Sequence, residues 1–338
     1  MLFEHVRIVG LAHVDAPERV TSAELDEQLA PALERFGVRP GLLEGLSGIV
    51  ARRYWPMGTM PSDAATLAAE KLFAEIDVDR AEVGVCVNTS VCRDYLEPST
   101  ACLVHSKLGL SSDCLNYDLG NACLAFLNAM DLVSNLIERG VIRYGLIVDG
   151  ENSRHVTQST IERILRGDST ADQYRNQFAS LTLGSGGAAM LLAHADTTDS
   201  QHRYLGCTNQ AATEWSHLCR GQADFMETDT RTLLEQGLAL AHRTLKVAEQ
   251  ERGWVVDELD EFVLHQVSRV HTEQLTSLLN VPQGRYLTIF EEFGNIGPAA
   301  VPIALSKSVQ AGRIEPGMRV ALMGIGSGLN CSMGEIVW

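Results

Sequence analysis

The sequence has few basic residues for its length. Its 338 residues include 27 lysines and arginines against 43 aspartates and glutamates, which gives a net charge of −16 at pH 7. A chain this acidic repels phosphate backbones unless basic residues gather in a local stripe. The nearest candidate is the pair Arg52 and Arg53, with single arginines scattered elsewhere. We therefore expect no nucleic-acid partner.

Metal-binding and disulfide patterns are missing as well. None of the eight cysteines forms a Cys-x-x-Cys pair. Most lie in apolar runs, where a free cysteine behaves as a small hydrophobic residue. The only metal-like spacing, His217-x-Cys219, is a weak signal for zinc. We expect free thiols in a reducing compartment and no bound metal.

Long apolar runs are also absent. No stretch reaches the ~20 residues of a membrane-spanning helix. Glu4, His5 and Arg7 interrupt the apolar core that a signal peptide would need. With 45% hydrophobic and 21% charged residues, the composition is that of a globular protein, and the length suggests two domains. The sequence thus predicts a cytoplasmic protein without a membrane span.

Short β-rich runs alternate with helix-length runs along the chain. This alternation is typical of an α/β fold with mostly parallel sheets that are covered on both faces. The predicted strands are 6–12, 83–88, 115–119, 144–148, 188–192, 262–265, 320–324 and 335–338. The main predicted helices are 64–75, 123–139, 230–249 and 299–310.

The two halves of the chain repeat one another. Gly120-Asn121 and Gly294-Asn295 are 174 residues apart, and each pair is expected to follow a short strand and precede a helix. Gly150 and Gly324 have the same separation, and each ends a predicted strand. A third match relates residues 87–90 to 265–268, 178 residues later. Chance similarity is the alternative, but three matches in one order favour an internal duplication.

The duplication divides the chain into an N-terminal half, 1–195, and a C-terminal half, 196–338. A charged insert at 151–181 lies between the matched motifs. Its polar runs are typical of a solvated face, although it could also line a channel or extend a dimer. In a duplicated α/β fold, the site is expected where the carboxyl ends of strands from both halves meet.

Cys123 follows Gly120-Asn121-Ala122 and begins a helix that is apolar on nearly every side. Such a helix is expected to be central. In its first turn, the unpaired N–H groups and the positive end of the helix dipole would favour a thiolate, which is the form a sulfur nucleophile needs. The alternative is an inert core cysteine, which is the ordinary role of a cysteine in an apolar helix.

His265 and Asn295 are the polar candidates of the second half. His265 ends a predicted strand, where it could simply pack or cap, and Asn295 lies between glycines, where it could stabilise its own turn. The repeat makes Asn295 the counterpart of Asn121, two residues before Cys123, so we expect Cys123 and Asn295 to converge. A thiol with a neutral imidazole and an amide suits thioester chemistry: the sulfur takes an acyl group while the other two stabilise an enolate.

Glycines crowd the segment 324–328, which follows a predicted strand. The segment lacks Gly-Lys-Ser/Thr and the full Gly-x-Gly-x-x-Gly pattern, so it is no nucleotide phosphate loop. Either a plain turn or a loop whose N–H groups face a developing oxyanion fits this composition.

The ordered motifs 121–123, 265–266, 294–299 and 324–328 together resemble the thiolase superfamily, in particular its initiating β-ketoacyl-carrier-protein synthases. The resemblance spans most of the chain. It implies a five-layered αβαβα fold of two similar halves and an obligate homodimer. It also implies Cys123 as acyl acceptor, His265 and Asn295 on the second thioester carbonyl, and the backbone N–H groups of Cys123 and Ser327 as an oxyanion hole.

The stretch 93–100, together with 121–126 and 265–269, is most similar to the OleA family. Its members join two long fatty acyl-CoA chains head to head in olefin biosynthesis. The resemblance implies that Glu97 reaches into the partner's site as general base. The alternative is a solvated loop carboxylate. Two simple acyl chains offer no CO₂ to lose, so an α-proton must be removed, and a shielded carboxylate is a stronger base.

The expected activity is therefore a non-decarboxylative Claisen condensation of two fatty acyl-CoA molecules. CoA is the substrate carrier, no other cofactor is expected, and downstream olefin-pathway enzymes are possible partners. One alternative is a decarboxylating synthase that uses a malonyl thioester. Another is a non-catalytic partner subunit of an active homologue, which the presence of Cys123, His265 and Asn295 argues against. The CoA nucleotide contacts and the chain length stay open.

Overall fold

The computed structural model describes residues 3–338. The strands of the first half are β1 (Val6–Asp15), β4 (Val83–Asn88), β5 (Leu115–Asp118), β6 (Tyr144–Glu151) and β7 (Gly186–His194). Those of the second half are β8 (Arg203–Ala211), β11 (Glu261–Leu264), β12 (Arg319–Gly326) and β13 (Asn330–Val337). The helices packed on them are α3 (Pro61–Glu75), α4 (Thr100–Leu108), α5 (Ala125–Glu138), α8 (Thr230–Arg252), α9 (Arg269–Leu278), α10 (Phe290–Phe293) and α11 (Ala300–Gln310).

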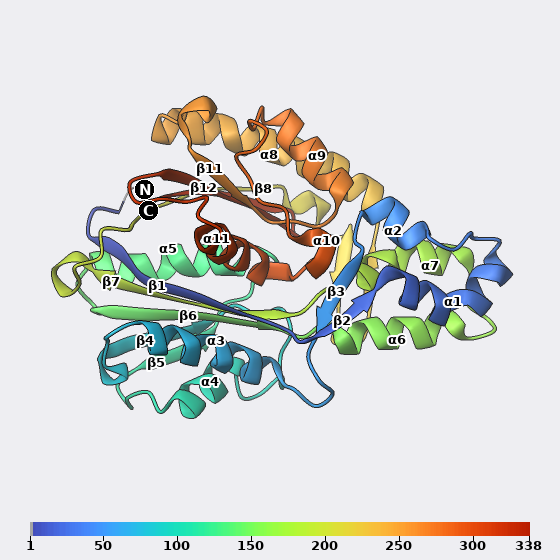
Figure 1. Cartoon of the computed structure of the whole chain (residues 1–338), viewed down its shortest axis with the longest axis horizontal. Coiled ribbons are helices and arrows are strands. Elements are labelled where there is room, and N and C mark those ends of the chain that lie inside the picture. Colours follow the sequence, from blue (N-terminus) through green and yellow to red (C-terminus); the bar gives the residue numbers. More distant parts are fainter. Residues whose placement is uncertain (1–2) are drawn as a thin grey trace.

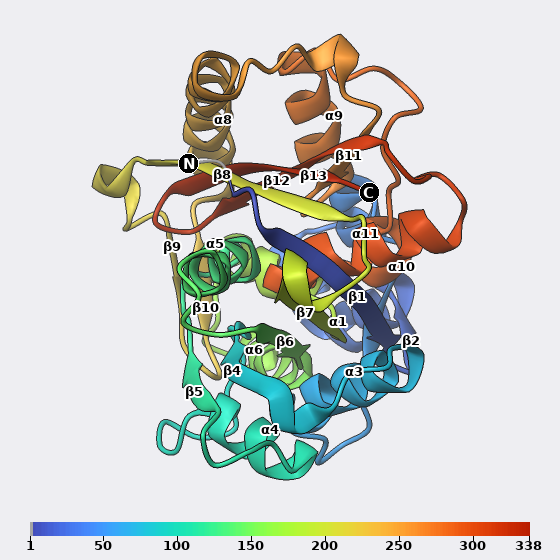
Figure 2. The ribbon, with the colours of Figure 1, turned by 90° about the vertical axis from the view of Figure 1, so that its left-hand side faces the viewer.

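These elements form five layers (Figure 1). Helices α8 and α9 cover the strands of the second half, and α3 and α4 cover those of the first half. Between the two sets of strands lie α5 and α11, and each of them contacts strands from both halves. The view in Figure 2 shows the same order from a second side. The predicted αβαβα fold is confirmed.

Strand order shows the duplication directly. The sheet runs β11-β12-β13-β8-β1-β7-β6-β4-β5, and β1 joins β8 at the single pair Arg7–Arg203. In the first half, β1 pairs antiparallel with β7, β7 antiparallel with β6, and β6 parallel with β4. The second half repeats this order: β8 pairs antiparallel with β13, β13 antiparallel with β12, and β12 parallel with β11. The counterpart of the parallel edge strand β5 is the isolated parallel bridge between Phe262 and Tyr286. The predicted division at 195/196 falls between β7 and β8 and stays a prediction.

Central strands are built from continuous apolar runs because both of their faces are covered. Every residue of β6 is buried. Helix α3 lies so close to this sheet that a Cβ on Gly150 would be 2.0 Å from the Pro61 oxygen, and one on Gly187 would be 2.6 Å from the Ala64 oxygen. The small glycines of the strands and alanines of α3 therefore allow the helix to lie this close to the sheet.

A side lobe holds the remaining elements. They are β2 (Glu18–Thr21), β3 (Ala51–Tyr54), α1 (Ser22–Phe36), α2 (Leu42–Ser47), α6 (Arg154–Leu165), α7 (Ala171–Gln177), β9 (Cys219–Gly221) and β10 (Met226–Thr228). The charged insert 151–181 supplies α6 and α7. Their apolar residues, including Ile161 and Tyr174, pack with Leu29 of α1 in a separate hydrophobic cluster. The insert thus has one packed side and one solvated side.

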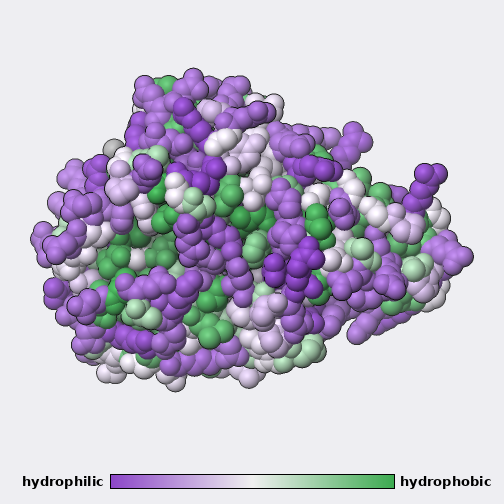
Figure 3. Space-filling model, in the orientation of Figure 1, coloured by the Kyte–Doolittle hydropathy of each residue, from purple (hydrophilic) through white to green (hydrophobic). Residues whose placement is uncertain are grey.

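On the face seen in Figure 1, hydrophilic residues cover α8, α9 and much of the side lobe, while hydrophobic residues gather over the middle layers (Figure 3). Among residues 3–338, no helix combines the length and the apolar character that crossing a bilayer requires. The same residues contain no cluster of three or more histidine, cysteine, aspartate or glutamate side chains suited to a metal ion.

Candidate active site

The segment between β5 and α5 carries Cys123 on a tight turn. Ala122 has φ 45°, and the N–H groups of Leu124 and Ala125 donate to the oxygens of Asn121 and Ala122. A left-handed alanine cannot belong to an α-helix. Helix α5 begins at Ala125, two residues after Cys123, so the prediction that Cys123 lies in its first turn is wrong by two residues.

The surroundings of the Cys123 sulfur also differ from the prediction. Desolvation raises the pKa of Cys123 to about 12, and Cys219 and Glu151 add to this shift. This shift opposes the thiolate that the sequence prediction expects from the helix dipole. Cys123 is a neutral thiol that must lose its proton as it reacts.

The glycine-rich segment 324–328 lies against this turn. A Cβ on Gly326 would be 3.4 Å from the Cys123 nitrogen and 3.4 Å from the Asn121 oxygen. The Asn330 amide donates to Asn121 Oδ1 at 3.1 Å, which joins the start of β13 to the turn that carries Cys123. The arrangement places the backbone of the segment that contains Ser327 beside Cys123, where the sequence predicts an oxyanion hole.

His265 follows the last residue of β11 and is only 3% exposed. Burial lowers the pKa of His265 to about 3, and the neighbouring His271 contributes to this. The ring is therefore neutral. Neither ring nitrogen has a hydrogen bond of standard geometry within the described residues, although the Asn295 amide lies close enough to favour the protonated ring. A neutral imidazole can donate one hydrogen bond to an oxyanion.

Asn295 is 8% exposed and is held by its backbone on both sides. Its N–H donates to the Thr182 oxygen at 2.9 Å, and its oxygen accepts from the Gly184 N–H at 2.8 Å. Its Oδ1 accepts from the Gly297 N–H at 3.0 Å, so the amide nitrogen is the end that can donate elsewhere. Asn295 does not follow a strand as predicted, because the short helix α10 precedes Gly294.

Gln266 fixes the chain that leads to Asn295. Its Nε2 donates to the Leu287 oxygen at 2.7 Å, and its Oε1 accepts the N–H groups of Ile289 and Phe290 at 2.7 and 3.2 Å. One buried amide therefore ties the residue after His265 to the segment before α10.

We expect Gln266→Ala to lower the free energy of unfolding by about 2 kcal/mol, because it leaves buried N–H groups without partners. The same change should slow catalysis, since Asn295 loses its support. Urea unfolding followed by circular dichroism measures the first effect. The matched control is Gln201→Ala, because Gln201 is exposed and its amide donates to the nearby Asp199 oxygen. Equal stability losses in both variants would contradict this account.

Glu97 lies on the exposed loop between β4 and α4. Val91, Tyr95 and Leu96 are exposed on the same loop, and Leu96 reaches 87%. The loop is anchored by Asp94, whose carboxylate accepts the Ser62 N–H at 2.8 Å. The chain thus brings His265 and Asn295 together, sets the glycine segment against Cys123, and leaves Glu97 facing outward.

Sequence comparison decides the family. The chain is 49% identical to the acyl-CoA:acyl-CoA alkyltransferase of Xanthomonas campestris pv. campestris over 338 residues, with all of both chains covered. It is 37% identical to the Shewanella oneidensis enzyme of the same name, again over both whole chains. The chain belongs to the OleA family of acyl-CoA:acyl-CoA alkyltransferases.

Solved structures agree with this family. The cerulenin-bound Xanthomonas campestris OleA superposes with a TM-score of 0.98 at 49% identity, covering all of this chain and 98% of that one. A variant of the same OleA with bound lauric acid and lauroyl-CoA gives a TM-score of 0.97 at 49% identity and covers all of both chains. Residues 250–338 also match the 3-oxoacyl-[acyl-carrier-protein (ACP)] synthase III C-terminal family. The predicted resemblance to the thiolase superfamily and to OleA is confirmed.

Two buried carboxyl groups of this OleA-family chain were not predicted. Asp149 and Glu151 lie two residues apart at the end of β6, and they are 0% and 4% exposed. Burial raises the pKa of both, that of Glu151 to about 7. The available signal was two acidic residues at the end of an apolar strand, which also describes an ordinary strand-to-turn boundary.

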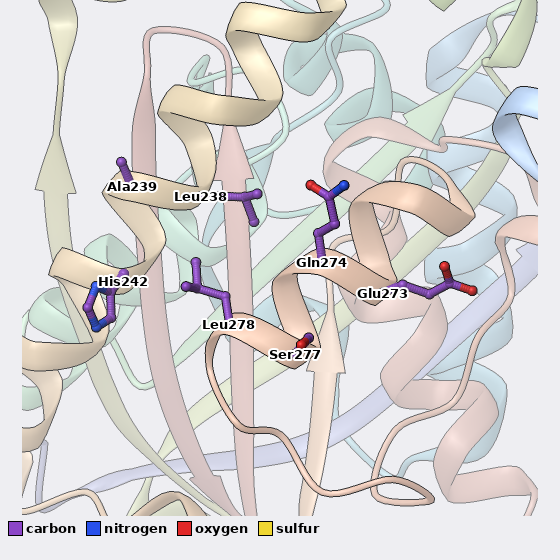
Figure 4. Close-up of a pocket in the computed structure, with 7 residues that line it drawn as sticks. All are labelled: Leu238, Ala239, His242, Glu273, Gln274, Ser277 and Leu278. Carbon is purple, nitrogen blue, oxygen red and sulfur yellow. The ribbon is translucent and has the colours of Figure 1, made fainter.

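A groove of about 640 Å³ lies elsewhere, between α8 and α9 (Figure 4). Leu238 and His242 face it from α8, and Glu273 and Leu278 line it from α9. It shares no lining residue with the predicted site. This groove therefore does not mark the predicted catalytic residues.

Proposed function

We propose that the protein joins two long-chain fatty acyl-CoA molecules in a non-decarboxylative Claisen condensation. One observation carries the assignment of roles. In the Xanthomonas OleA, structures exist of variants at a glutamate, at a cysteine 26 residues later, and at a histidine 142 residues after that. Glu97, Cys123 and His265 have the same two spacings. The full-length match without a length difference supports their equivalence.

In the first half-reaction, the Cys123 sulfur attacks the thioester carbonyl of one acyl-CoA, and CoA leaves as a thiol. The backbone N–H groups of Cys123 and Ser327 stabilise the oxyanion that forms in between. The close approach of the 324–328 backbone to the Cys123 nitrogen supports this role. The product is a Cys123 acyl thioester and free CoA.

In the second half-reaction, Glu97 removes an α-proton from one of the two acyl chains. The electron pair of the broken C–H bond forms the enolate, whose oxygen accepts hydrogen bonds from His265 and Asn295. The α-carbon then attacks the carbonyl of the other thioester, whose thiolate leaves. The product is a 2-alkyl-3-oxoacyl thioester, or the corresponding acid after hydrolysis. A neutral His265 suits this role, because it donates a hydrogen bond without acting as an acid.

We propose a homodimer in which Glu97 acts in the partner's site. The exposed position of Glu97 and the exposed apolar residues Val91, Tyr95 and Leu96 on its loop support this. The reaction requires no bound cofactor, because each substrate carries its own CoA. Cytoplasmic location and the supply of the keto product to later enzymes of olefin biosynthesis belong to the same proposal.

Incubation of the purified protein with myristoyl-CoA as sole substrate tests the reaction. We expect release of CoA together with a β-keto acid or its ketone breakdown product, measured by a thiol assay and gas chromatography. A strict requirement for a malonyl thioester would instead support a decarboxylating synthase, to which the C-terminal family match is related. Absence of any Cys123 acyl adduct by mass spectrometry would support a non-catalytic subunit.

A further inference from the structure

The carboxylate of Glu151 holds the base of the loop that carries Glu97. Glu151 is the last residue of β6 and is 4% exposed. Its Oε1 accepts the Val91 N–H at 2.6 Å, and its Oε2 accepts the Cys92 N–H at 3.3 Å. These two residues open the loop that leads to Glu97, so both carboxylate oxygens are committed to its backbone.

Two other parts of the site lie near the same side chain. A Cβ on Gly297 would lie 3.5 Å from Glu151 Cδ, and Gly297 is the residue whose N–H fixes the Asn295 amide. Glu151 also lies close enough to Cys123 to raise the pKa of its thiol. Three segments that are distant in sequence therefore meet at one buried carboxyl group.

We propose that Glu151 is a positioning residue, which orients Glu97 for the condensation step by fixing residues 91 and 92 beside the nucleophile turn. The inference rests on the proposed function, because it assigns the α-proton to Glu97. If Glu97 acts in the partner's site, Glu151 links the nucleophile of one protomer to the base that serves the other.

The ionisation state of Glu151 gives this role a distinctive pH dependence. Burial raises the pKa of Glu151 to about 7. The titratable groups that face it are Asp149 on β6, the Cys92 thiol of the loop and the Cys123 thiol. The nearest basic residue in sequence, Arg154, instead donates to the Trp55 oxygen and to Glu18. Protonation below pH 7 places a hydrogen on one oxygen and weakens its bond to the loop.

Glu151→Gln tests the proposal, because it keeps the shape of the side chain and removes its charge. We expect Cys123 to be acylated within a factor of about three of the unaltered protein, while condensation per acylated enzyme falls about tenfold or more. The unaltered protein should show a rise in condensation per acyl-enzyme between pH 6 and 8, and the variant should not. Hydrogen–deuterium exchange of residues 91–98 should be faster in the variant.

Glu151→Asp provides a second variant if Glu151→Gln folds poorly. It keeps the charge but withdraws the carboxylate by one methylene, so it cannot reach both N–H groups, and the same separation of acylation from condensation is expected. Glu261→Gln is the matched control. Glu261 is likewise buried, at 3% exposed, and accepts a hydrogen bond from Arg313, but it lies at the end of β11 that is opposite His265. This variant should leave the ratio of condensation to acylation unchanged.

The proposal is overturned if Glu151→Gln slows acylation and condensation equally, or if the exchange of residues 91–98 is unchanged. Those outcomes would make Glu151 a support for the nucleophile or for folding alone. Failure of the proposed function has a different signature: the unaltered protein would form no condensation product from acyl-CoA. The exchange measurement on residues 91–98 still reports on Glu151 in that case.

Discussion

Cys123→Ala should abolish acyl transfer altogether. The variant removes the only atom that the proposed mechanism bonds to the first acyl chain, so neither CoA release nor product formation should exceed the uncatalysed rate. Cys123→Ser is expected to be nearly as inactive, because burial lowers the pKa of both nearby imidazoles, that of His265 to about 3 and that of His271 to about 4, so each is a poor base for an alcohol. Single-turnover release of CoA from myristoyl-CoA measures both.

The raised pKa of the thiol adds a pH prediction for the same residue. Because burial raises the pKa of the Cys123 thiol to about 12, the thiol form dominates at pH 7, and the thiolate fraction should rise with pH. Alkylation by iodoacetamide, followed by mass spectrometry of the Cys123 peptide, should therefore accelerate steadily from pH 7 to pH 10. A plateau at neutral pH would show that the resting protein holds a thiolate.

A matched cysteine variant separates chemistry from packing. Cys86 lies on β4, is fully buried and has no part in the mechanism. Cys86→Ala removes one buried sulfur and should lower stability modestly while CoA release continues. If Cys86→Ala and Cys123→Ala lost activity equally, the loss would reflect damage to the fold rather than absence of the nucleophile.

The buried layers of this fold were predictable from sequence because their strands need continuous apolar runs. β4 has the predicted bounds, and β6 and β12 differ only in length. β8 was missed, because its end is polar and looks like a turn. There Asn209 donates to the Asp131 carboxylate, and Ser332 donates to the Asn209 oxygen. Tertiary partners, which lie far away in sequence, decide that such a segment is a strand.

The position of a site residue was predictable where the apolar pattern that predicts a strand also places that residue. His265 comes directly after β11, whose residues pair in register with β12, so its position followed from the apolar run before it. The start of α5 did not follow, because nothing in the composition of 121–124 requires the left-handed Ala122. Glu151 was missed for a related reason: its significance comes from the N–H groups of Val91 and Cys92, which only the folded chain brings to it.

Glu97→Ala should separate the two half-reactions. Acylation of Cys123 should persist, because it needs no base at an α-carbon, whereas condensation should fall by a factor of about 10² to 10⁴, the range of a general base. Glu97→Gln should behave alike, since an amide cannot take the α-proton. Mass spectrometry of the acyl-enzyme and chromatography of the product measure the two steps. Glu315→Ala, which changes an exposed glutamate before β12, is the control and should leave both steps unchanged.

Mixing two inactive variants then tests where Glu97 acts. A chain with Cys123→Ala still has Glu97, and a chain with Glu97→Ala still has Cys123. If Glu97 serves the partner's site, a mixed dimer contains one complete site, because the first chain supplies the base and the second the nucleophile. Random exchange of equal amounts should therefore restore about a quarter of the unaltered activity. If Glu97 serves its own chain, no mixed dimer has a complete site, and the mixture stays as inactive as its components.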